Sequence, residues 1–155
     1  MRSSFLIMRL LFGLIALALT TQIAFAAISD SQGEAYRQRC LYLWVEDNPA
    51  HYSDLASVCT MAALYQKQLA DKTSGGERQS HLILEANAFF LGAKGNINPP
   101  TEANFRAMAA KLAASRQLLI NVRDHAVSPA IRKQAVDLLQ NVDGLISDLT
   151  KMFSP

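Results

Sequence analysis

Apolar residues recur at helical spacing in five blocks along the chain, after a polar entry at residues 29–33. Residues three and four apart share one face of a helix, and the period-two alternation of β-branched residues that is typical of strands does not occur in these blocks. The pattern therefore predicts an all-α fold. The expected helices cover about 34–47, 49–72, 77–93 and 102–125, and a fifth helix begins at Ser128-Pro129.

The breaks between the blocks carry residues that stop or start helices. Pro49 ends the first helix, because the residue before a proline is driven out of the helical region. Asn48 and Ser53 are candidate N-caps for the second helix, Thr101 is one for the fourth, and Ser128 followed by proline marks the start of the fifth. Because the connections are short, we expect an up-and-down bundle of four to five antiparallel helices.

The third and fifth blocks have the widest apolar surfaces. The third is apolar on nearly every side from Leu82 to Leu91, which predicts a central helix, and Gly92 and Gly95 are assigned to the loop that follows it. The fifth should pack against more than one neighbour. Its stripe comprises Ile131, Ala135, Leu138, Val142, Leu145, Leu149 and Met152, widened by Leu139, Ile146 and Phe153.

The two cysteines, Cys40 and Cys59, are predicted to form one disulfide. Cys40 precedes the turn at Asn48 by 8 residues and Cys59 follows Pro49 by 10, so an antiparallel hairpin brings them nearly level at about 1.5 Å rise per residue. A metal site is disfavoured because there is no CxxC pair and no suitably spaced histidine. An intermolecular disulfide stays an open alternative. The disulfide would join the first helical hairpin.

The first 26 residues have the pattern of a cleaved secretory signal. Arg2 and Arg9 give a basic start, an apolar run of ten residues follows from Leu10 to Leu19, and Ala24 and Ala26 supply small residues before the expected cut. The alternative, a retained membrane anchor, is disfavoured because a spanning helix needs about 20 apolar residues. The sequence thus predicts a signal peptide at 1–26, a single helical domain at 27–155, and a periplasmic or secreted location.

Signal cleavage removes the apparent positive charge. The whole chain has a formal net charge of +2, with 15 basic and 13 acidic residues. Arg2 and Arg9 leave with the signal, so 13 basic residues face 13 acidic ones in the exported part. Nucleic acids and anionic membranes are bound through net positive charge. We therefore expect neither nucleic-acid binding nor membrane insertion after cleavage.

Sequence signatures of catalysis are missing from the chain. There is no GxSxG, SxxK, HExxH or CxxCH motif, so hydrolase, metal and covalent-haem chemistry have no recognisable basis. His81 and Glu85 are four apart and would share a helical face, but such a pair is more often part of a solvated strip than of a metalloenzyme. We expect a protein that is not an enzyme, with no catalytic residue, metal or cofactor.

The aromatic residues are distributed asymmetrically. All four tyrosines and the single tryptophan lie between Tyr36 and Tyr65. Tyrosine, tryptophan and arginine are enriched at interfaces, which makes Tyr42, Trp44, Arg37 and Arg39 candidate partner-binding residues. Tyr42 is the leading exposed residue, because positions two apart on a helix face differently and Trp44 lies nearer the buried stripe. The alternative, that these rings close one end of a small core, stays open.

These observations favour an exported helical protein of the bacterial envelope that acts by binding another protein. An adaptor, a periplasmic chaperone and a toxin inhibitor or immunity protein all fit this description, and a homo-oligomer is possible. The alternative is a small-ligand carrier whose cavity lies inside the bundle. The cavity residues expected for the carrier are Phe89, Phe90, Phe105, Met108 and Met152.

Overall fold

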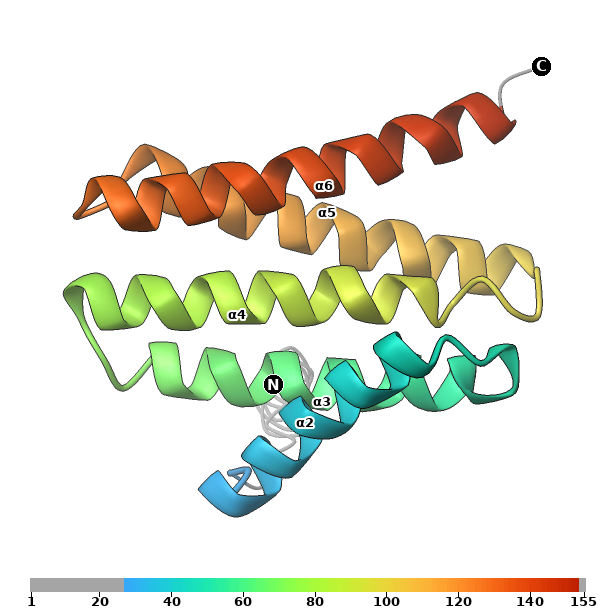
Figure 1. Ribbon diagram of the computed structural model, residues 1–155, viewed down its shortest axis with the longest axis horizontal. Coiled ribbons are helices and arrows are strands. Elements are labelled where there is room, and N and C mark those ends of the chain that lie inside the picture. Colours follow the sequence, from blue (N-terminus) through green and yellow to red (C-terminus); the bar gives the residue numbers. More distant parts are fainter. Residues whose placement is uncertain (1–26, 154–155) are drawn as a thin grey trace, which may run out of the picture.

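The computed structural model describes residues 27–153, and in that range it contains five α-helices and one short 3₁₀ helix (Figure 1). The predicted all-α bundle of antiparallel helices is confirmed, whereas the predicted signal segment lies outside the described residues. The elements are α2 (Asp30–Glu46), η1 (Pro49–His51), α3 (Tyr52–Ala70), α4 (Gly75–Lys94), α5 (Glu102–Asp124) and α6 (Pro129–Phe153).

The first helix begins four residues earlier than the sequence pattern indicated. Ser29 and Gln32 form a capping box: the Ser29 Oγ accepts from the Gln32 N–H at 3.4 Å, and the Gln32 Oε1 accepts from the Ser29 N–H at 3.3 Å. These bonds satisfy amide groups at the helix start that have no partner within the helix. The polar entry that was expected to precede the helix is therefore its first turn.

The expected N-caps were right at three positions and wrong at one. The Thr101 Oγ1 accepts from the Asn104 N–H at 3.2 Å, and the Ser128 Oγ accepts from the Ile131 N–H at 3.3 Å. Asn48 caps the short η1 helix through the Ala50 N–H. Ser53 lies inside the first turn of α3 and caps nothing, because η1 takes up the residues between the two long helices.

The helices α3 to α6 lie side by side in chain order, and α2 crosses α3 obliquely (Figure 1). The helix α4 packs against α2, α3, α5 and α6, which confirms the prediction that the third helix is central. Buried side chains form two clusters, and Phe90 contacts both. One cluster lies between α2, α3 and α4, and the other lies between α4, α5 and α6.

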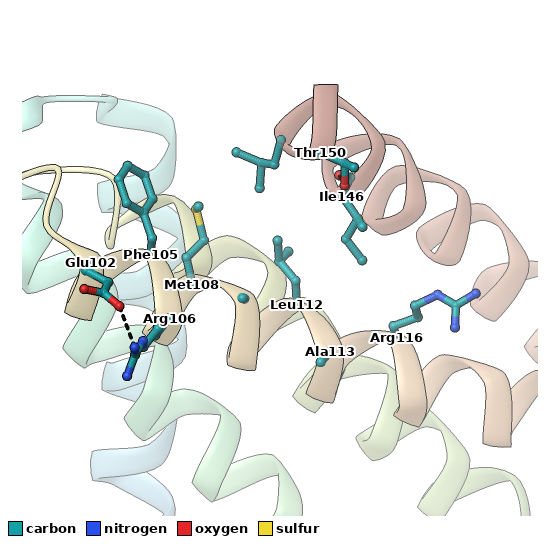
Figure 2. Close-up of a pocket in the computed structure, with 11 residues that line it drawn as sticks. Glu102, Phe105, Arg106, Met108, Leu112, Ala113, Arg116, Ile146 and Thr150 are labelled. Carbon is teal, nitrogen blue, oxygen red and sulfur yellow. Dashed lines mark hydrogen bonds and ion pairs between the residues drawn. The ribbon is translucent and has the colours of Figure 1, made fainter. Parts of the chain in front are cut away.

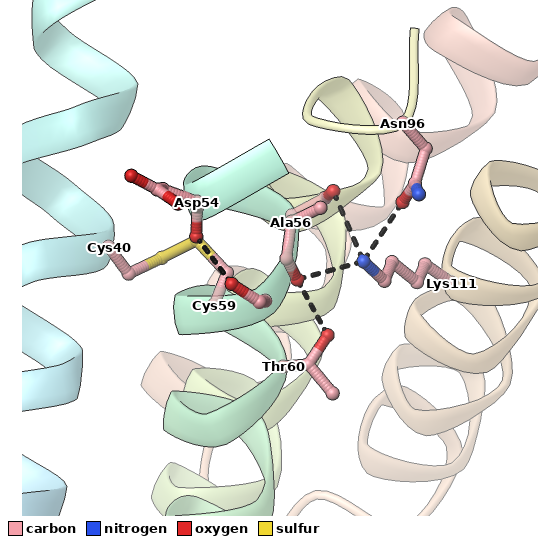
Figure 3. The surroundings of a disulfide bond; sticks show 9 residues. Cys40, Asp54, Ala56, Cys59, Thr60, Asn96 and Lys111 are labelled. Carbon is pink, nitrogen blue, oxygen red and sulfur yellow. Dashed lines mark hydrogen bonds between the residues drawn. A yellow bond between two sulfur atoms is a disulfide. The ribbon is translucent and has the colours of Figure 1, made fainter. Parts of the chain in front are cut away.

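The predicted disulfide joins α2 to α3 (Figure 3). The two sulfur atoms of Cys40 and Cys59 are 2.05 Å apart and the Cα atoms are 4.9 Å apart. Both residues are buried, with 2% and 0% of their surface exposed. The described residues contain no free cysteine, so the hairpin is fixed by an intramolecular bond.

The assignment of Gly92 and Gly95 to a loop was wrong for Gly92, which lies within α4. A β-carbon at Gly92 would lie 2.9 Å from the Cβ of Cys59, and one at Gly95 would lie 2.3 Å from the carbonyl oxygen of Tyr52. Only glycine fits between these backbones. The glycines therefore let the end of α4 pack directly onto α3 beside the disulfide.

The last helix, α6, packs against α5 and to a smaller extent against α4, as its wide apolar stripe predicted. Its C-terminal half diverges from α5 (Figure 1), and Leu145, Ile146 and Leu149 stay only partly buried. The last two residues of the expected stripe, Met152 and Phe153, lie at the end of α6, and their side chains are outside the described part of the structure.

Candidate functional site

The exposed apolar residues of α2 gather on the side opposite the disulfide. Leu41, Tyr42 and Val45 are 38%, 56% and 79% exposed, and their spacing places them next to one another on the helix. Leu84 of α4, 40% exposed, lies near Leu41, since both line a small pocket of about 80 Å³ between α2, α3 and α4. We call Leu41, Tyr42, Val45 and Leu84 the α2 face.

Of the four predicted partner-binding residues, the structure brings Tyr42 and Arg39 together. The Arg39 guanidinium lies 5.2 Å from the centroid of the Tyr42 ring, a cation–π distance. Among residues 27–153 no carboxylate forms an ion pair with Arg39. The α2 face thus ends in an exposed ring beside an arginine with free donor groups.

Trp44 is partly buried and lies at the contact between α2 and α4. Its ring packs against Phe90 at a centroid distance of 6.1 Å, and the Lys94 ammonium lies 4.8 Å from its centroid. Lys94 also forms an ion pair with Asp47 that lowers the pKa of this carboxyl. Trp44 therefore fits the alternative expectation that the aromatic rings close one end of the core. Tyr42 does not, because it is exposed.

Arg37 lies apart from Tyr42. Its guanidinium forms an ion pair with Glu34 at 2.6 Å, and this bond lowers the pKa of Glu34 to about 2. Arg37 also lines the small pocket beside Leu41. It borders the α2 face and is already paired, whereas Arg39 is available to a carboxylate from outside.

A larger apolar groove of about 870 Å³ lies between α5 and α6, where the two helices diverge (Figure 2). Phe105, Met108 and Leu112 of α5 face Ile146 and Leu149 of α6 across it, and exposed charged residues border it. Its volume falls in the range of ligand pockets. Unlike a cavity inside the bundle, it is formed at the surface by the last two helices.

The residues expected for a carrier cavity are not brought together. Phe105 and Met108 line the groove between α5 and α6. Phe89 packs against the other cluster, between α2, α3 and α4, and Phe90 contacts both clusters without lining the groove. The side chain of Met152 is outside the described part of the structure.

The His81 and Glu85 pair does not converge on a common ligand position. The His81 Nδ1 bonds the Gln66 Oε1 at 2.9 Å, whereas Glu85 is buried and its Oε2 has no partner in the described residues. Burial raises the pKa of Glu85 to about 7. In residues 27–153 no group of three or more His, Cys, Asp or Glu side chains is placed to hold a metal ion.

Lys111 is a half-buried amine that the sequence did not single out. Its Nζ donates to the Ala56 carbonyl and to the Asn96 Oδ1, both at 2.9 Å, and more weakly to the Gly92 carbonyl at 3.4 Å (Figure 3). Burial lowers the pKa of Lys111 to about 8. A cation near the C-terminus of α4 suits the helix dipole, so this amine fastens α5 to the contact between α3 and α4.

Sequence reasoning named Tyr42 and Arg39 as candidates but did not single out Leu41, Val45 and Leu84, which the structure places beside them. The available signal was the position of Leu41 and Val45 on α2, outside the stripe that carries Cys40 and Leu43. The groove was missed because its existence depends on how far α6 lies from α5.

Comparisons of the chain with protein-family models, with curated proteins and with solved structures found no match. No helix within residues 27–153 has the length and apolar character needed to span a bilayer.

Proposed function

We propose that the protein is exported and acts by binding another protein through the α2 face. The observation that carries the proposal is that Leu41, Tyr42 and Val45 lie exposed side by side on a helix whose other side is bonded to α3. Single exposed apolar residues are ordinary on protein surfaces, but contiguous ones mark interaction sites. The α2 face is such a group.

The disulfide contributes to binding by fixing the shape of this surface. Cys40 lies directly before Leu41 in the chain and is bonded to Cys59 of α3. A surface that is already ordered loses less conformational entropy when a partner binds. Truncation of an exposed residue on the α2 face should therefore change affinity without changing the fold.

The residues of the α2 face also indicate the chemistry of the partner. Tyrosine and arginine are enriched among the residues that dominate binding energy, and Arg39 beside Tyr42 offers guanidinium donors to a carboxylate. The partner surface should present an apolar side chain to Val45 and Leu41, next to an Asp or Glu that reaches Arg39.

Export is supported by two independent features. A disulfide in a small domain is typical of oxidising compartments outside the cytoplasm, and the first 26 residues have the pattern of a secretory signal. An adaptor, a periplasmic chaperone and a toxin inhibitor or immunity protein are all forms of this function. Mass spectrometry of the protein purified from the envelope of the producing bacterium should find Ala27 as the first residue.

Site-specific photocrosslinking tests the α2 face in the producing cell. A photoreactive amino acid at position 42 or 45 should capture the same protein, and the same group at exposed Lys133 of α6 should not capture it. Capture of one set of proteins from all three positions, or of none from positions 42 and 45, would count against this face.

Binding measured with the captured protein then tests the energetics. We expect Tyr42→Ala and Val45→Asp each to weaken binding by about tenfold or more, as for residues that dominate an interface. Lys133→Ala is the matched surface control and should leave affinity unchanged. Unchanged affinity in both α2 variants, with folding intact by circular dichroism, would reject the α2 face.

A second candidate function is the carrier of a small apolar ligand, supported by the volume of the groove and by Phe105 and Met108 in its wall. A ligand that binds only the folded protein raises the melting temperature. Fatty acids and phospholipids are the probes that match an apolar groove. A rise in melting temperature that Ile146→Asp abolishes would favour the carrier, and the absence of a rise with either class would remove it.

A further inference from the structure

The face of α5 that lines the groove has a symmetric pattern about Ala109. Eight residues of α5 line the groove, and five of them form this pattern: Glu102, Phe105, Ala109, Ala113 and Arg116. The other three are Arg106, Met108 and Leu112 (Figure 2). The successive spacings of the five are three, four, four and three residues. A second α5 that packs antiparallel to the first, with a two-fold axis at Ala109, therefore places Glu102 opposite Arg116 and Phe105 opposite Ala113.

These opposed positions are complementary in charge and in size. Glu102 is acidic and Arg116 is basic, and both are exposed. Phe105 is large and Ala113 is small, so the ring of one copy can fill the space above the alanine of the other. Ala109 lies at the axis itself, where a small exposed residue lets the two backbones approach closely. One face thus carries both halves of each interaction, as a two-fold interface requires.

We propose that the groove between α5 and α6 is the interface of a homodimer in which the two α5 helices pack antiparallel. In this arrangement the partner's α5 lies in the groove, against Ile146 and Leu149 of α6, and the symmetric contact forms on the other copy. The half-exposed apolar residues of both grooves then share one core.

The charges of the groove favour a second copy over a differently charged partner. Glu102, Arg106 and Arg116 line the groove, where Glu102 pairs with Arg106 at 2.5 Å, and Arg116 pairs with Asp143, outside the lining, at 2.7 Å, so each of these charges has a partner of opposite sign. In the dimer Glu102 also reaches Arg116 of the second copy. The exported part of the chain has 13 residues of each sign, so two copies do not repel each other through net charge.

A dimer through this groove leaves the α2 face free. The helices α2 and α6 lie at opposite ends of the stack (Figure 1). Two α2 faces would be displayed by one dimer, which would strengthen attachment to a partner that offers two sites. The dimer does not depend on the proposed function, because its contacts involve α5 and α6 alone.

Sedimentation equilibrium of the protein, expressed from its full chain and purified, tests the oligomeric state. We expect the mass of a dimer at micromolar concentration, and a tenfold or greater rise in dimer dissociation constant for Glu102→Arg and for Arg116→Glu. The double variant should return toward the wild-type constant, because the two charges have exchanged places. Arg78→Glu on α4 is the control and should stay dimeric.

Cysteine crosslinking places the axis. Ala109→Cys should form a covalent dimer on mild oxidation, because the two introduced thiols meet at the two-fold axis. Ala103→Cys, which is also exposed on α5 but does not line the groove, should not. Since Cys40 and Cys59 are bonded to each other, the introduced thiol is the free one in each chain.

Three results would overturn the dimer. A monomeric mass up to millimolar concentration would reject it, as would a dimer that persists unchanged in both single charge reversals. A dimer lost through Tyr42→Ala but kept through the α5 variants would move the interface to the α2 face. If Tyr42→Ala loses partner binding but stays dimeric, the homodimer is still supported. The experiments therefore test partner binding through the α2 face and the homodimer independently.

Discussion

The two ends of the helix stack are held together in different ways. The helices α2, α3 and α4 are joined by the disulfide, by glycines at backbone contact distance, and by an ion pair between Lys94 and Asp47. The helices α5 and α6 meet through apolar side chains and the exposed ion pair between Arg116 and Asp143, and they diverge around a groove of about 870 Å³. At the α2 end the helices are in close contact and the exposed apolar residues lie on outer surfaces, whereas at the other end a groove opens between the helices themselves.

This difference in packing between the two ends indicates which surfaces are open to a partner. Closely packed helices cannot separate to admit another chain without breaking many contacts at once. Partners can therefore reach the α2 end only through its outer surfaces, which include the α2 face and a hollow of about 500 Å³ lined by Ile28, Met61 and Leu64. The C-terminal half of α6 diverges from α5 and leaves a groove that can receive a helix. Substitutions at the two ends should therefore differ in their effects on the free energy of unfolding and on hydrogen exchange.

Removal of the disulfide should have the largest effect. The bond joins residues 19 apart, and closing a loop of this length contributes about 3 kcal/mol in the chain-entropy model. We expect the free energy of unfolding in urea to fall by about that amount in the double variant Cys40→Ala, Cys59→Ala. Hydrogen exchange should quicken more in α2 than in α6, and an equal increase in both helices would remove the contrast between the two ends.

Gly95→Ala should destabilise the protein by about 1–3 kcal/mol, the range found for overpacked sites. The added methyl group would lie 2.3 Å from the Tyr52 carbonyl oxygen and 2.4 Å from the Ala56 nitrogen. These are backbone atoms of α3 and cannot move independently. Urea unfolding measures the loss, and a change below about 0.5 kcal/mol would show that α3 and α4 are not in close contact here.

Glu85→Gln should stabilise the protein at alkaline pH. Burial raises the pKa of Glu85 from 4.5 to about 7 in the folded state, so the folded protein favours the protonated carboxyl. This contribution to stability is complete below pH 4.5 and is lost as the pH rises through 7. Relative to wild type, the variant should gain about 2 kcal/mol in unfolding free energy between pH 5 and pH 8.

Urea unfolding at both pH values measures this gain. Glu77→Gln removes an exposed carboxylate from the same helix and controls for the change in net charge. If the two variants have the same pH dependence, the carboxyl of Glu85 is not isolated between α3 and α4.

Gly144→Ala should have the smallest effect, and of the opposite sign to Gly95→Ala. A β-carbon at Gly144 meets no atom within 4 Å, and alanine inside a helix is favoured over glycine by about 0.5–1 kcal/mol. The same substitution should thus destabilise the α3–α4 contact and stabilise α6. A destabilising result for Gly144→Ala would indicate that a partner approaches this part of α6, and sedimentation of the variant would identify a second copy as that partner.

Much of the fold followed from local sequence patterns. Apolar periodicity gave the five helices, and the placement of Asn48-Pro49 between the cysteines gave the Cys40–Cys59 bond. The errors lay at helix ends. Ser29 extended α2 through a capping box, and α4 includes Gly92, where a β-carbon would lie 2.9 Å from the Cβ of Cys59.

The candidate sites were less accessible to sequence reasoning. Tyr42 and Trp44 are equally aromatic and two residues apart, yet one is 56% exposed and the other packs against Phe90. Arg37 and Arg39 are also two residues apart, but Arg37 forms an ion pair with Glu34 and Arg39 does not. Helical phase predicted that Tyr42 is exposed, as the structure has it. The partners of the two arginines depend on side-chain distances that the order of residues does not give.

The sequence by itself determined the helices, the disulfide and the absence of recognisable catalytic motifs, because these depend on neighbours along the chain and on covalent chemistry. Only the tertiary structure decided which apolar residues stay uncovered. Val45, and the groove between Phe105 and Leu149, are visible only once the helices are placed. The physical reason is that burial is a property of surfaces that meet in space, and those surfaces come from segments far apart in the chain.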